Sequence, residues 1–351
     1  MKRRLYWLAV AAVFLLAILP AQVFAQGYKA PEGAIAPTPL KAGSQFSGPL
    51  SFKAGTKARV AYMPPTTNPY YTAIGEGVKA RAAELGVEVF VLAPTDQMDI
   101  ASQMKMLQDV PTQGANAIIL STHDENAAGP LVKRLTAQGI GVVIVNSDIA
   151  AFPSPVNAVV GYNQRNTTRK LGEYIAKLVK GKATVGVLEG GPGYHSGERV
   201  GGFLEAFKKY PGMKVVASLP TAWDQETGNK ATLDMLQAHP DINLIVAAND
   251  YEAIGAAAAV KSLNRKDVQI WGNDGDTTAM EQIYAGQWSG TSNTVPFIMG
   301  KITMQVTMDV LNGKFPGGYV ETPATITTKD NAIQFLSHPE NLFPKPSKVY
   351  K

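Results

Sequence analysis

Apolar and polar residues alternate along this chain in a pattern that repeats from about residue 58 to residue 293. Short apolar runs typical of buried strands occur at 58–63, 87–92, 117–120, 141–145 and 157–161. A second series follows at 184–188, 214–219, 244–248, 268–272 and 289–293. Apolar residues between the strands recur at helical spacing, as at Ile74, Val78 and Ala82, and Gly86 is expected to end that helix.

The helices expected in the second half of the chain lie at 167–179, 200–210, 227–237, 253–263 and 278–285. Strands that alternate with helices predict an α/β fold, with parallel sheets covered on both faces. Because the two series repeat one order of elements, we expect two lobes of the same architecture. A chain of 351 residues is long enough for about two domains.

Polar side chains follow several of these strands at their carboxyl ends. The set comprises Asp124, Asn146, Asp148, Asn249, Asp250 and Asp274. Each one alone is most often a turn or cap residue. Together they lie at the sheet edge where open α/β sheets bind ligands. The pattern therefore predicts two polar rims that close around a small polar molecule.

The loop after the first strand carries Asn68, Pro69, Tyr70 and Tyr71. Tyrosine rings offer flat faces on which sugars stack, and an amide can pair with a hydroxyl that is both donor and acceptor. The alternative is structural, with Asn68 capping the next helix and both tyrosines in the core. Both interpretations can hold for Asn68.

The segment 189–199 contains four glycines and ends in Glu198 and Arg199. It lacks the spacing of a dinucleotide or P-loop motif, so we interpret it as a ligand-facing loop or as a purely structural one. Trp223 follows the strand 214–219 and is either a stacking platform for a ligand or a core residue.

No catalytic or metal-binding set emerges from the sequence. The four histidines have no metal-type spacing. A metal at His123, Asp124 and Glu125 is a weak alternative, and the nucleophile-elbow motif of hydrolases is absent from the sequence. We therefore predict a protein that is not an enzyme and that needs no cofactor.

The first 25 residues are typical of a signal peptide. Lys2, Arg3 and Arg4 precede an apolar run at 5–19, and cleavage before Gln26 is expected. A membrane anchor is the alternative, although the run is shorter than the roughly 20 residues that span a bilayer. Residues 26–56 are rich in proline and glycine and are interpreted as an extension or linker.

Charge and cysteine content narrow the function further. Without Lys2, Arg3 and Arg4 the 33 basic residues become 30, against 28 acidic ones, so nucleic acid is not an expected partner. The chain has no cysteine, which excludes disulfides, thiol catalysis and cysteine-bound zinc. An exported and unanchored protein fits a bacterial periplasm.

Several short segments together resemble the type I periplasmic sugar-binding proteins of ABC transporters, in the group similar to ribose-binding protein. The resemblance covers roughly residues 57–330. Its motifs are Asn-Pro-Tyr-Tyr at 68–71, Gly-Glu-Arg-Val-Gly-Gly-Phe at 197–203, Trp-Asp at 223–224, Ala-Asn-Asp-Tyr-Glu-Ala-Ile-Gly-Ala at 248–256 and Gly-Asn-Asp-Gly at 272–275.

The resemblance implies two doubly wound parallel-sheet lobes joined by a three-stranded hinge. The first lobe would comprise residues 57–161 and 294–323, and the second residues 162–293 and 324–330. The tail at 331–351 lies beyond the usual end of the family. A monomer is expected.

The resemblance also implies the ligand contacts. First-lobe contacts would be Pro64, Asn68, Tyr70, Tyr71, Ser121, Asn146 and Ser147. The second lobe would supply Gly197, Trp223, Asn249 and Asp274, with Thr294 at the hinge. Ribose-type members have Asp-Arg at positions 146–147, Arg at 197 and Gln at 294. Asp148, His195 and Arg199 are candidates to replace the missing charged groups, and Asp124 remains a candidate from its strand end.

These departures make a different pentose, a deoxysugar, a polyol or a furanose as suitable a ligand as ribose. The function implied is capture of a small carbohydrate or polyol in the periplasm and its delivery to an inner-membrane ABC permease. Two alternatives remain open. One is a sensor of the same fold that signals to a membrane kinase or chemoreceptor, and the other is an enzyme acting on a sugar.

Overall fold

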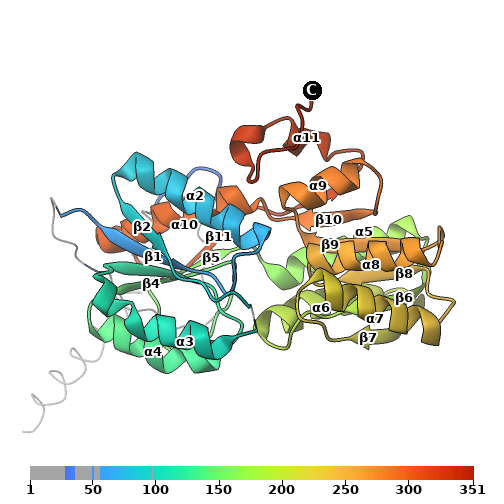
Figure 1. The fold of residues 1–351 in the computed structure, drawn as a ribbon, viewed down its shortest axis with the longest axis horizontal. Coiled ribbons are helices and arrows are strands. Elements are labelled where there is room, and N and C mark those ends of the chain that lie inside the picture. Colours follow the sequence, from blue (N-terminus) through green and yellow to red (C-terminus); the bar gives the residue numbers. More distant parts are fainter. Residues whose placement is uncertain (1–27, 36–49, 51–55, 97) are drawn as a thin grey trace, which may run out of the picture.

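The computed structural model describes residues 28–35, 50, 56–96 and 98–351. The predicted signal peptide at 1–25 lies outside the described residues, as does most of the predicted extension at 26–56. Figure 1 shows two lobes side by side, each with one sheet between layers of helices. The α/β fold with two doubly wound lobes is therefore confirmed.

The first lobe contains a six-stranded sheet with the order β11-β5-β4-β3-β1-β2. All of its strands run parallel. Its strands are β1 (Arg59–Met63), β2 (Glu88–Val91), β3 (Ala117–Leu120), β4 (Gly141–Val145), β5 (Ala158–Gly161) and β11 (Tyr319–Glu321). The central strands β3, β4 and β5 are buried along their whole length, as uninterrupted apolar runs predict.

The second lobe contains a six-stranded sheet with the order β12-β10-β9-β8-β6-β7. Its strands are β6 (Lys182–Leu188), β7 (Gly212–Leu219), β8 (Leu244–Ala247), β9 (Gln269–Asp274), β10 (Gly290–Asn293) and β12 (Thr325–Thr328). The edge strand β12 is antiparallel to β10, whereas the other pairs are parallel. The second sheet is thus parallel, as predicted, apart from one antiparallel strand at its edge.

Helices cover both faces of each sheet. In the first lobe they are α2 (Pro69–Leu85), α3 (Ile100–Asp109), α4 (Glu125–Ala137) and α10 (Pro296–Leu311). In the second they are α5 (Gln164–Leu178), α6 (Tyr194–Phe207), α7 (Gln225–Ala238), α8 (Asp250–Ser262) and α9 (Thr277–Tyr284). The helices α2 and α10 share one core layer, and α3 and α4 share the opposite one.

Several helices begin earlier than their apolar stripes predict. A polar residue that accepts a backbone N–H fixes each start, as Asn163 does for α5, Asp224 for α7 and Asn249 for α8. At α8 the cap is a capping box, with Asn249 and Glu252 bonding each other's backbone. The helix α6 starts at Tyr194, so 194–199 is helical and not part of a loop.

The chain passes between the two sheets three times. It leaves the first sheet after β5, returns to it through α10 after β10, and crosses again between β11 and β12. Asn293 and Thr294 are fully buried at the second crossing. Three crossings that lie close together leave the lobes free to rotate about a common hinge, which is the geometry of domain closure around a ligand.

Close packing of α2 against α10 depends on two glycines. A Cβ at Gly77 would collide with the carbonyl oxygen of Phe297, and one at Gly300 with the carbonyl oxygen of Ile74. Gly77→Ala is therefore expected to lower the free energy of unfolding by about 1–3 kcal/mol, because backbone cannot easily yield to overpacking. Gly197 offers the matched control, since no atom lies within 4 Å of the position of its Cβ.

Gly197→Ala is expected to leave stability unchanged or to raise it by about 0.5–1 kcal/mol, the helical preference of alanine over glycine. Urea denaturation of both variants measures the difference. Equal unfolding midpoints for Gly77→Ala and the wild type would contradict this account of the α2–α10 contact.

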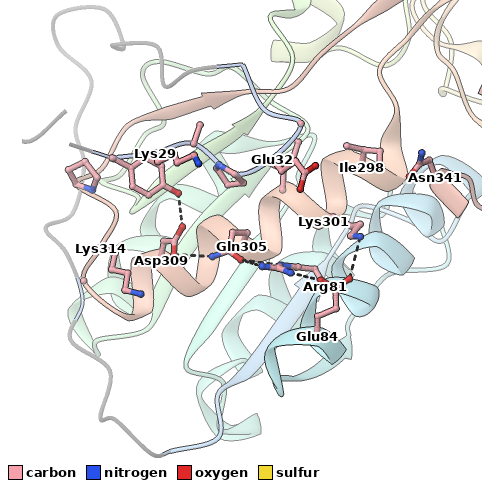
Figure 2. Close-up of a pocket in the computed structure, with 17 residues that line it drawn as sticks. Lys29, Glu32, Arg81, Glu84, Ile298, Lys301, Gln305, Asp309, Lys314 and Asn341 are labelled. Atoms are coloured by element: carbon pink, nitrogen blue, oxygen red, sulfur yellow. Dashed lines mark hydrogen bonds and ion pairs between the residues drawn. The ribbon is translucent and has the colours of Figure 1, made fainter. Parts of the chain in front are cut away.

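A cavity of about 1030 Å³ lies on the outer side of the first lobe. Residues 28–33, α2 and α10 line it, and Asn341 reaches it from the C-terminal tail. Figure 2 shows that some of its polar side chains bond one another, as Arg81 does with Gln305. The hydroxyl of Tyr28 donates to Asp309. Among its described lining residues, none carries a buried polar atom that lacks a partner.

The C-terminal tail packs on the second lobe. Its short helix α11 (Ile333–Leu336) and Leu342 join Met280 of α9 in a small apolar cluster. Glu281 of α9 accepts hydrogen bonds from the backbone and hydroxyl of Ser347 and from the hydroxyl of Tyr350. Within the described part of the chain, no helix is long and apolar enough to cross a membrane.

Candidate functional site

Predicted ligand residues of both lobes meet between the two sheets. They surround a cavity of about 20 Å³, the space of roughly one water molecule. The lining residues are Asn68, Tyr70, Tyr71, His123, Asn146, His195, Arg199, Trp223, Asn249 and Asp274. A sugar is much larger than one water molecule, so the lobes lie in a closed arrangement that has to open to admit such a ligand.

The first-lobe wall is built at the start of α2. The side chain of Asn68 accepts the backbone N–H of Tyr71 at 3.0 Å and so caps the helix. Tyr70 and Tyr71 are buried, as the structural interpretation of this loop predicts, and both also line the cavity. The Tyr70 hydroxyl lies 2.9 Å from the Asn146 amide oxygen and 2.9 Å from the Thr294 hydroxyl. These bonds tie the wall to the hinge.

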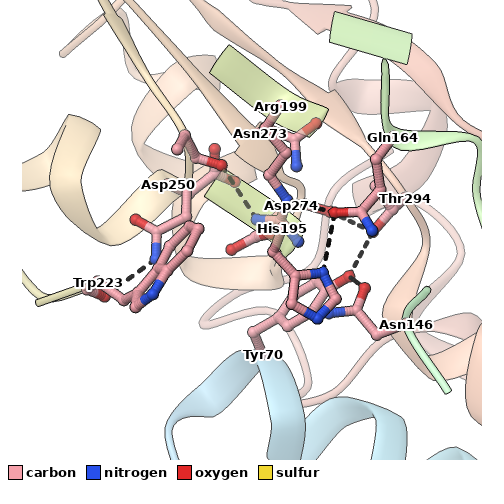
Figure 3. Close-up of polar contacts among 12 residues, drawn as sticks. Tyr70, Asn146, Gln164, His195, Arg199, Trp223, Asp250, Asn273, Asp274 and Thr294 are labelled. Carbon is pink, nitrogen blue, oxygen red and sulfur yellow. Dashed lines mark hydrogen bonds and ion pairs between the residues drawn. The ribbon is translucent and has the colours of Figure 1, made fainter. Parts of the chain in front are cut away.

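The centre of the second-lobe wall is an ion pair between Arg199 of α6 and Asp274 at the end of β9. Figure 3 shows the two side chains converging, with 3.3 Å between guanidinium and carboxylate. Arg199 also donates to the side-chain oxygen of Gln164 at 2.9 Å and to the carbonyl of Ala248 at 3.0 Å. Burial raises the pKa of Asp274, and the charge of Arg199 opposes that rise.

Gln164 fixes the orientation of two lining side chains. Its side-chain oxygen accepts from Arg199, so the Nδ1 of His195 at 3.0 Å from the same oxygen is the donor, which assigns the tautomer of that imidazole. Its amide nitrogen donates to Asp148 at 3.3 Å. Asp148 also accepts from the hydroxyl of Tyr194 at 3.1 Å, and burial raises its pKa to about 6.

Two further carboxyl groups support the loops of the second lobe. Asp250 accepts the backbone N–H of Gly275 at 2.6 Å. Glu252 accepts the backbone N–H groups of Gly190 and Asn249, each at 2.9 Å. Burial raises the pKa of both carboxyl groups to about 7. They hold backbone in place behind the cavity and do not line it.

The glycines of the loop before α6 make room for the indole of Trp223. A Cβ at Gly190 or at Gly191 would collide with that ring. The glycine-rich sequence thus serves close packing here. Trp223 has a backbone φ of 65°, which is strained for a residue with a side chain. Its carbonyl accepts the side-chain amide of Asn249 at 2.9 Å.

His123 also lines the cavity, although sequence reasoning considered it only as a weak metal ligand. It lies in the loop after β3, on the edge that carries the other strand-end residues, and this position was the available signal. Its ring stacks on Trp223 with 5.6 Å between ring centroids and 13° between planes. Burial and the nearby charge of Arg199 lower its pKa to about 4. Among the described residues, no group of three potential metal ligands occurs.

The remaining predicted contacts lie close by but do not line the cavity. Asp124 caps α4 by accepting the N–H of Ala127 at 2.8 Å. Thr294 lies behind Tyr70, and Asp148 lies behind Gln164. Gly197 is exposed on α6, where its carbonyl accepts from Arg165. The other predicted contacts that are buried outside the lining are Pro64, Ser121 and Ser147.

The family model of a periplasmic binding protein domain matches residues 60–315, which is most of the chain. The chain belongs to the periplasmic binding protein family. A D-ribose/D-allose-binding protein of Pseudomonas aeruginosa is 29% identical over 287 residues, or 78% of this chain and 89% of that protein. A D-apiose import binding protein of Paraburkholderia graminis is 28% identical over 220 residues, or 63% of this chain and 70% of that protein.

A solved structure supports the same assignment. It is an ABC transporter periplasmic solute binding protein from Actinobacillus succinogenes with bound D-allose. The identity is 26% and the TM-score 0.74, over 79% of this chain and 100% of that one. The resemblance to type I periplasmic sugar-binding proteins is therefore confirmed. The members of this family are binding proteins rather than enzymes.

Proposed function

We propose that this chain captures an uncharged small sugar or polyol between its two lobes in the periplasm and delivers it to an inner-membrane ABC permease. The observation that carries the proposal is the composition of the lining. Aromatic rings and side-chain amides from both lobes surround one ion pair, that of Arg199 with Asp274. Rings suit the C–H faces of a sugar, and amides suit its hydroxyls.

The charges of the lining favour a neutral ligand. Arg199 is permanently charged, and Asp274 is its counter-charge. His123 and His195 have lowered pKa values because they are buried, so both are neutral near pH 7. A phosphate or carboxylate on the ligand would have no unpaired cation among the lining residues to bind. Burial of a charge without a partner costs free energy, so an anionic ligand is disfavoured.

The mechanism is capture without chemistry. A ligand that contacts both lobes binds the closed arrangement better than the open one and shifts the population toward closure. The permease would then bind the closed surface. Transport is favoured over sensing because the relatives described above are named as sugar-binding or import-binding proteins. The same relatives support the periplasmic location proposed here, and the monomeric state stays a prediction.

A thermal-shift screen tests this function. The screen compares neutral compounds, namely D-ribose, D-allose, D-apiose, deoxysugars and polyols. It also includes D-ribose 5-phosphate as the charged counterpart of D-ribose. A ligand at 100 times its Kd stabilises the folded state by about 2.7 kcal/mol, which raises the Tm by several degrees. A shift with a neutral compound and none with the phosphate ester is expected. A shift with the charged compound alone would contradict the proposal.

A further inference from the structure

His123 belongs to the first lobe but makes its ring contacts with the second. Its imidazole stacks on the indole of Trp223, and it also meets His195 edge to face at 5.9 Å between centroids. Trp223 and His195 come from the second lobe, in the segment before α7 and in α6. The imidazole therefore lines the cavity from the first lobe, in contact with the indole and the second imidazole, and its environment changes when the lobes separate.

Two polar atoms of the lining are buried and have no hydrogen-bond partner. They are the Nε2 of His123 and the Nε1 of Trp223. Other polar lining groups are engaged within the protein, as Asn249 is with the carbonyl of Trp223 and Asn68 with the backbone of Tyr71. A buried polar atom without a partner costs free energy. These two nitrogens are thus positioned to bond a ligand.

The chemistry of the two nitrogens defines the ligand group that they can share. The indole N–H of Trp223 is a donor only, whereas the Nε2 of a neutral imidazole accepts or donates according to its tautomer. A hydroxyl both donates and accepts, so a ligand hydroxyl can bond either nitrogen. A methyl group at the same place would leave both unpaired.

We propose that His123 is a ligand-binding and specificity-determining residue, whose Nε2 bonds a ligand hydroxyl beside the indole of Trp223. The inference rests on the proposed function. Near neutral pH the imidazole is uncharged, because its pKa is lowered to about 4. It can therefore accept a hydrogen bond, which a protonated ring cannot. This role belongs to the geometry of the closed cleft and requires no metal.

Two substitutions of His123 separate hydrogen bonding from ring stacking. His123→Phe keeps a flat ring without a polar atom, and His123→Gln keeps an amide whose oxygen can accept, and whose nitrogen can donate, a hydrogen bond near the position of Nε2. Isothermal titration calorimetry uses the tightest binder among D-ribose, D-allose and D-apiose. His123→Phe is expected to weaken binding at least tenfold, and His123→Gln by less than His123→Phe. His338→Gln is the control, since His338 is exposed.

The titrations of the two His123 variants can each overturn the inference. An affinity of His123→Phe within twofold of the wild type would overturn the inference, as would equal losses in His123→Phe and His123→Gln. If the wild type binds none of the three sugars, the neutral compound that binds best in the thermal-shift screen takes their place; if no neutral compound binds, the proposed function fails and the inference fails with it. Sugar binding by the wild type that is insensitive to His123→Phe refutes this inference alone.

A measurement on the unaltered protein removes any dependence on the folding of the variants. Four histidines are few enough for their ring nitrogens to be resolved by ¹⁵N NMR. Saturation with the same sugar is expected to move the Nε2 resonance of His123 and to leave those of His338 in place. A His123 Nε2 resonance that does not move would overturn the inference.

Discussion

Asp274→Ala is expected to weaken sugar binding by about 100-fold or more. Asp274 is buried at the end of β9, lines the cavity and forms an ion pair with Arg199. Its removal leaves ligand hydroxyls without an acceptor, which costs about 1–3 kcal/mol of binding free energy for each hydroxyl. It also leaves the guanidinium of Arg199 buried without its counter-charge, which costs about 3–5 kcal/mol where one partner of a buried pair is removed.

Calorimetric titration and thermal denaturation together separate the two effects of this substitution. Asp274→Asn keeps the shape of the side chain and is expected to retain more stability than Asp274→Ala while still binding weakly. Asp234→Ala is the matched control, because Asp234 is largely exposed and pairs only with Lys230 within α7. Wild-type affinity in Asp274→Ala would refute the assignment of the site.

Falling pH is expected to weaken ligand binding through His123. The pKa of His123 is about 4 in the closed cleft, because the ring is buried and lies near Arg199. In an open or unfolded state the ring meets water, and its pKa returns toward the ordinary value of about 6.5. Its contribution to closure is thus complete above pH 6.5 and is lost as pH falls toward 4. At pH 5 the loss approaches about 2 kcal/mol, or about 30-fold in affinity.

Three buried carboxyl groups make the stability of the folded protein depend on pH in the opposite direction. Asp148, Asp250 and Glu252 have raised pKa values in the folded protein, so their contribution to stability is present at low pH and is lost as pH rises. They remain in His123→Gln, and the comparison of that variant with the wild type cancels them. The ratio of the wild-type Kd to the Kd of His123→Gln is expected to rise by about 10-fold to 30-fold when the pH falls from 7.5 to 5. A ratio that is independent of pH would contradict the buried environment of His123.

The fold follows from local sequence signals that tertiary structure does not override. Ala117–Leu120 and Leu244–Ala247 are wholly apolar, and each forms a fully buried central strand. Gly86, expected to end the first helix, caps it in a left-handed conformation. The helix starts were less accurate, because Asn163, Asp224 and Asn249 begin helices that apolar stripes alone place later.

The second-lobe contacts show how helical geometry decides between neighbouring residues. The resemblance implied Gly197 as a contact, whereas the structure brings His195 and Arg199 into the lining. Residues four apart on a helix share a face, and the residue between them at 197 points to the other side. The four glycines of 189–199 favour a loop, and they conceal the helical spacing that begins at Tyr194. Its glycines before α6 instead accommodate the indole of Trp223.

Contacts between the lobes could not be predicted from either half of the sequence. His123 meets Trp223 only because the lobes close on each other, although 100 positions separate them in the chain. The bond of Asp148 to Tyr194 joins a loop that follows β4 to the start of α6. Strand-end position identified the rim of each lobe, but which side chains face each other across the rims depends on the hinge.

Calorimetric titration of the purified protein with D-ribose, D-allose and D-apiose, each compared with D-ribose 5-phosphate, tests the central claim most directly. One neutral sugar bound per chain is expected, with no binding of the phosphate ester and at least a 100-fold loss in Asp274→Ala. Binding of the phosphate ester as tight as that of the sugar, or no binding of any neutral sugar or polyol, would contradict the proposed function.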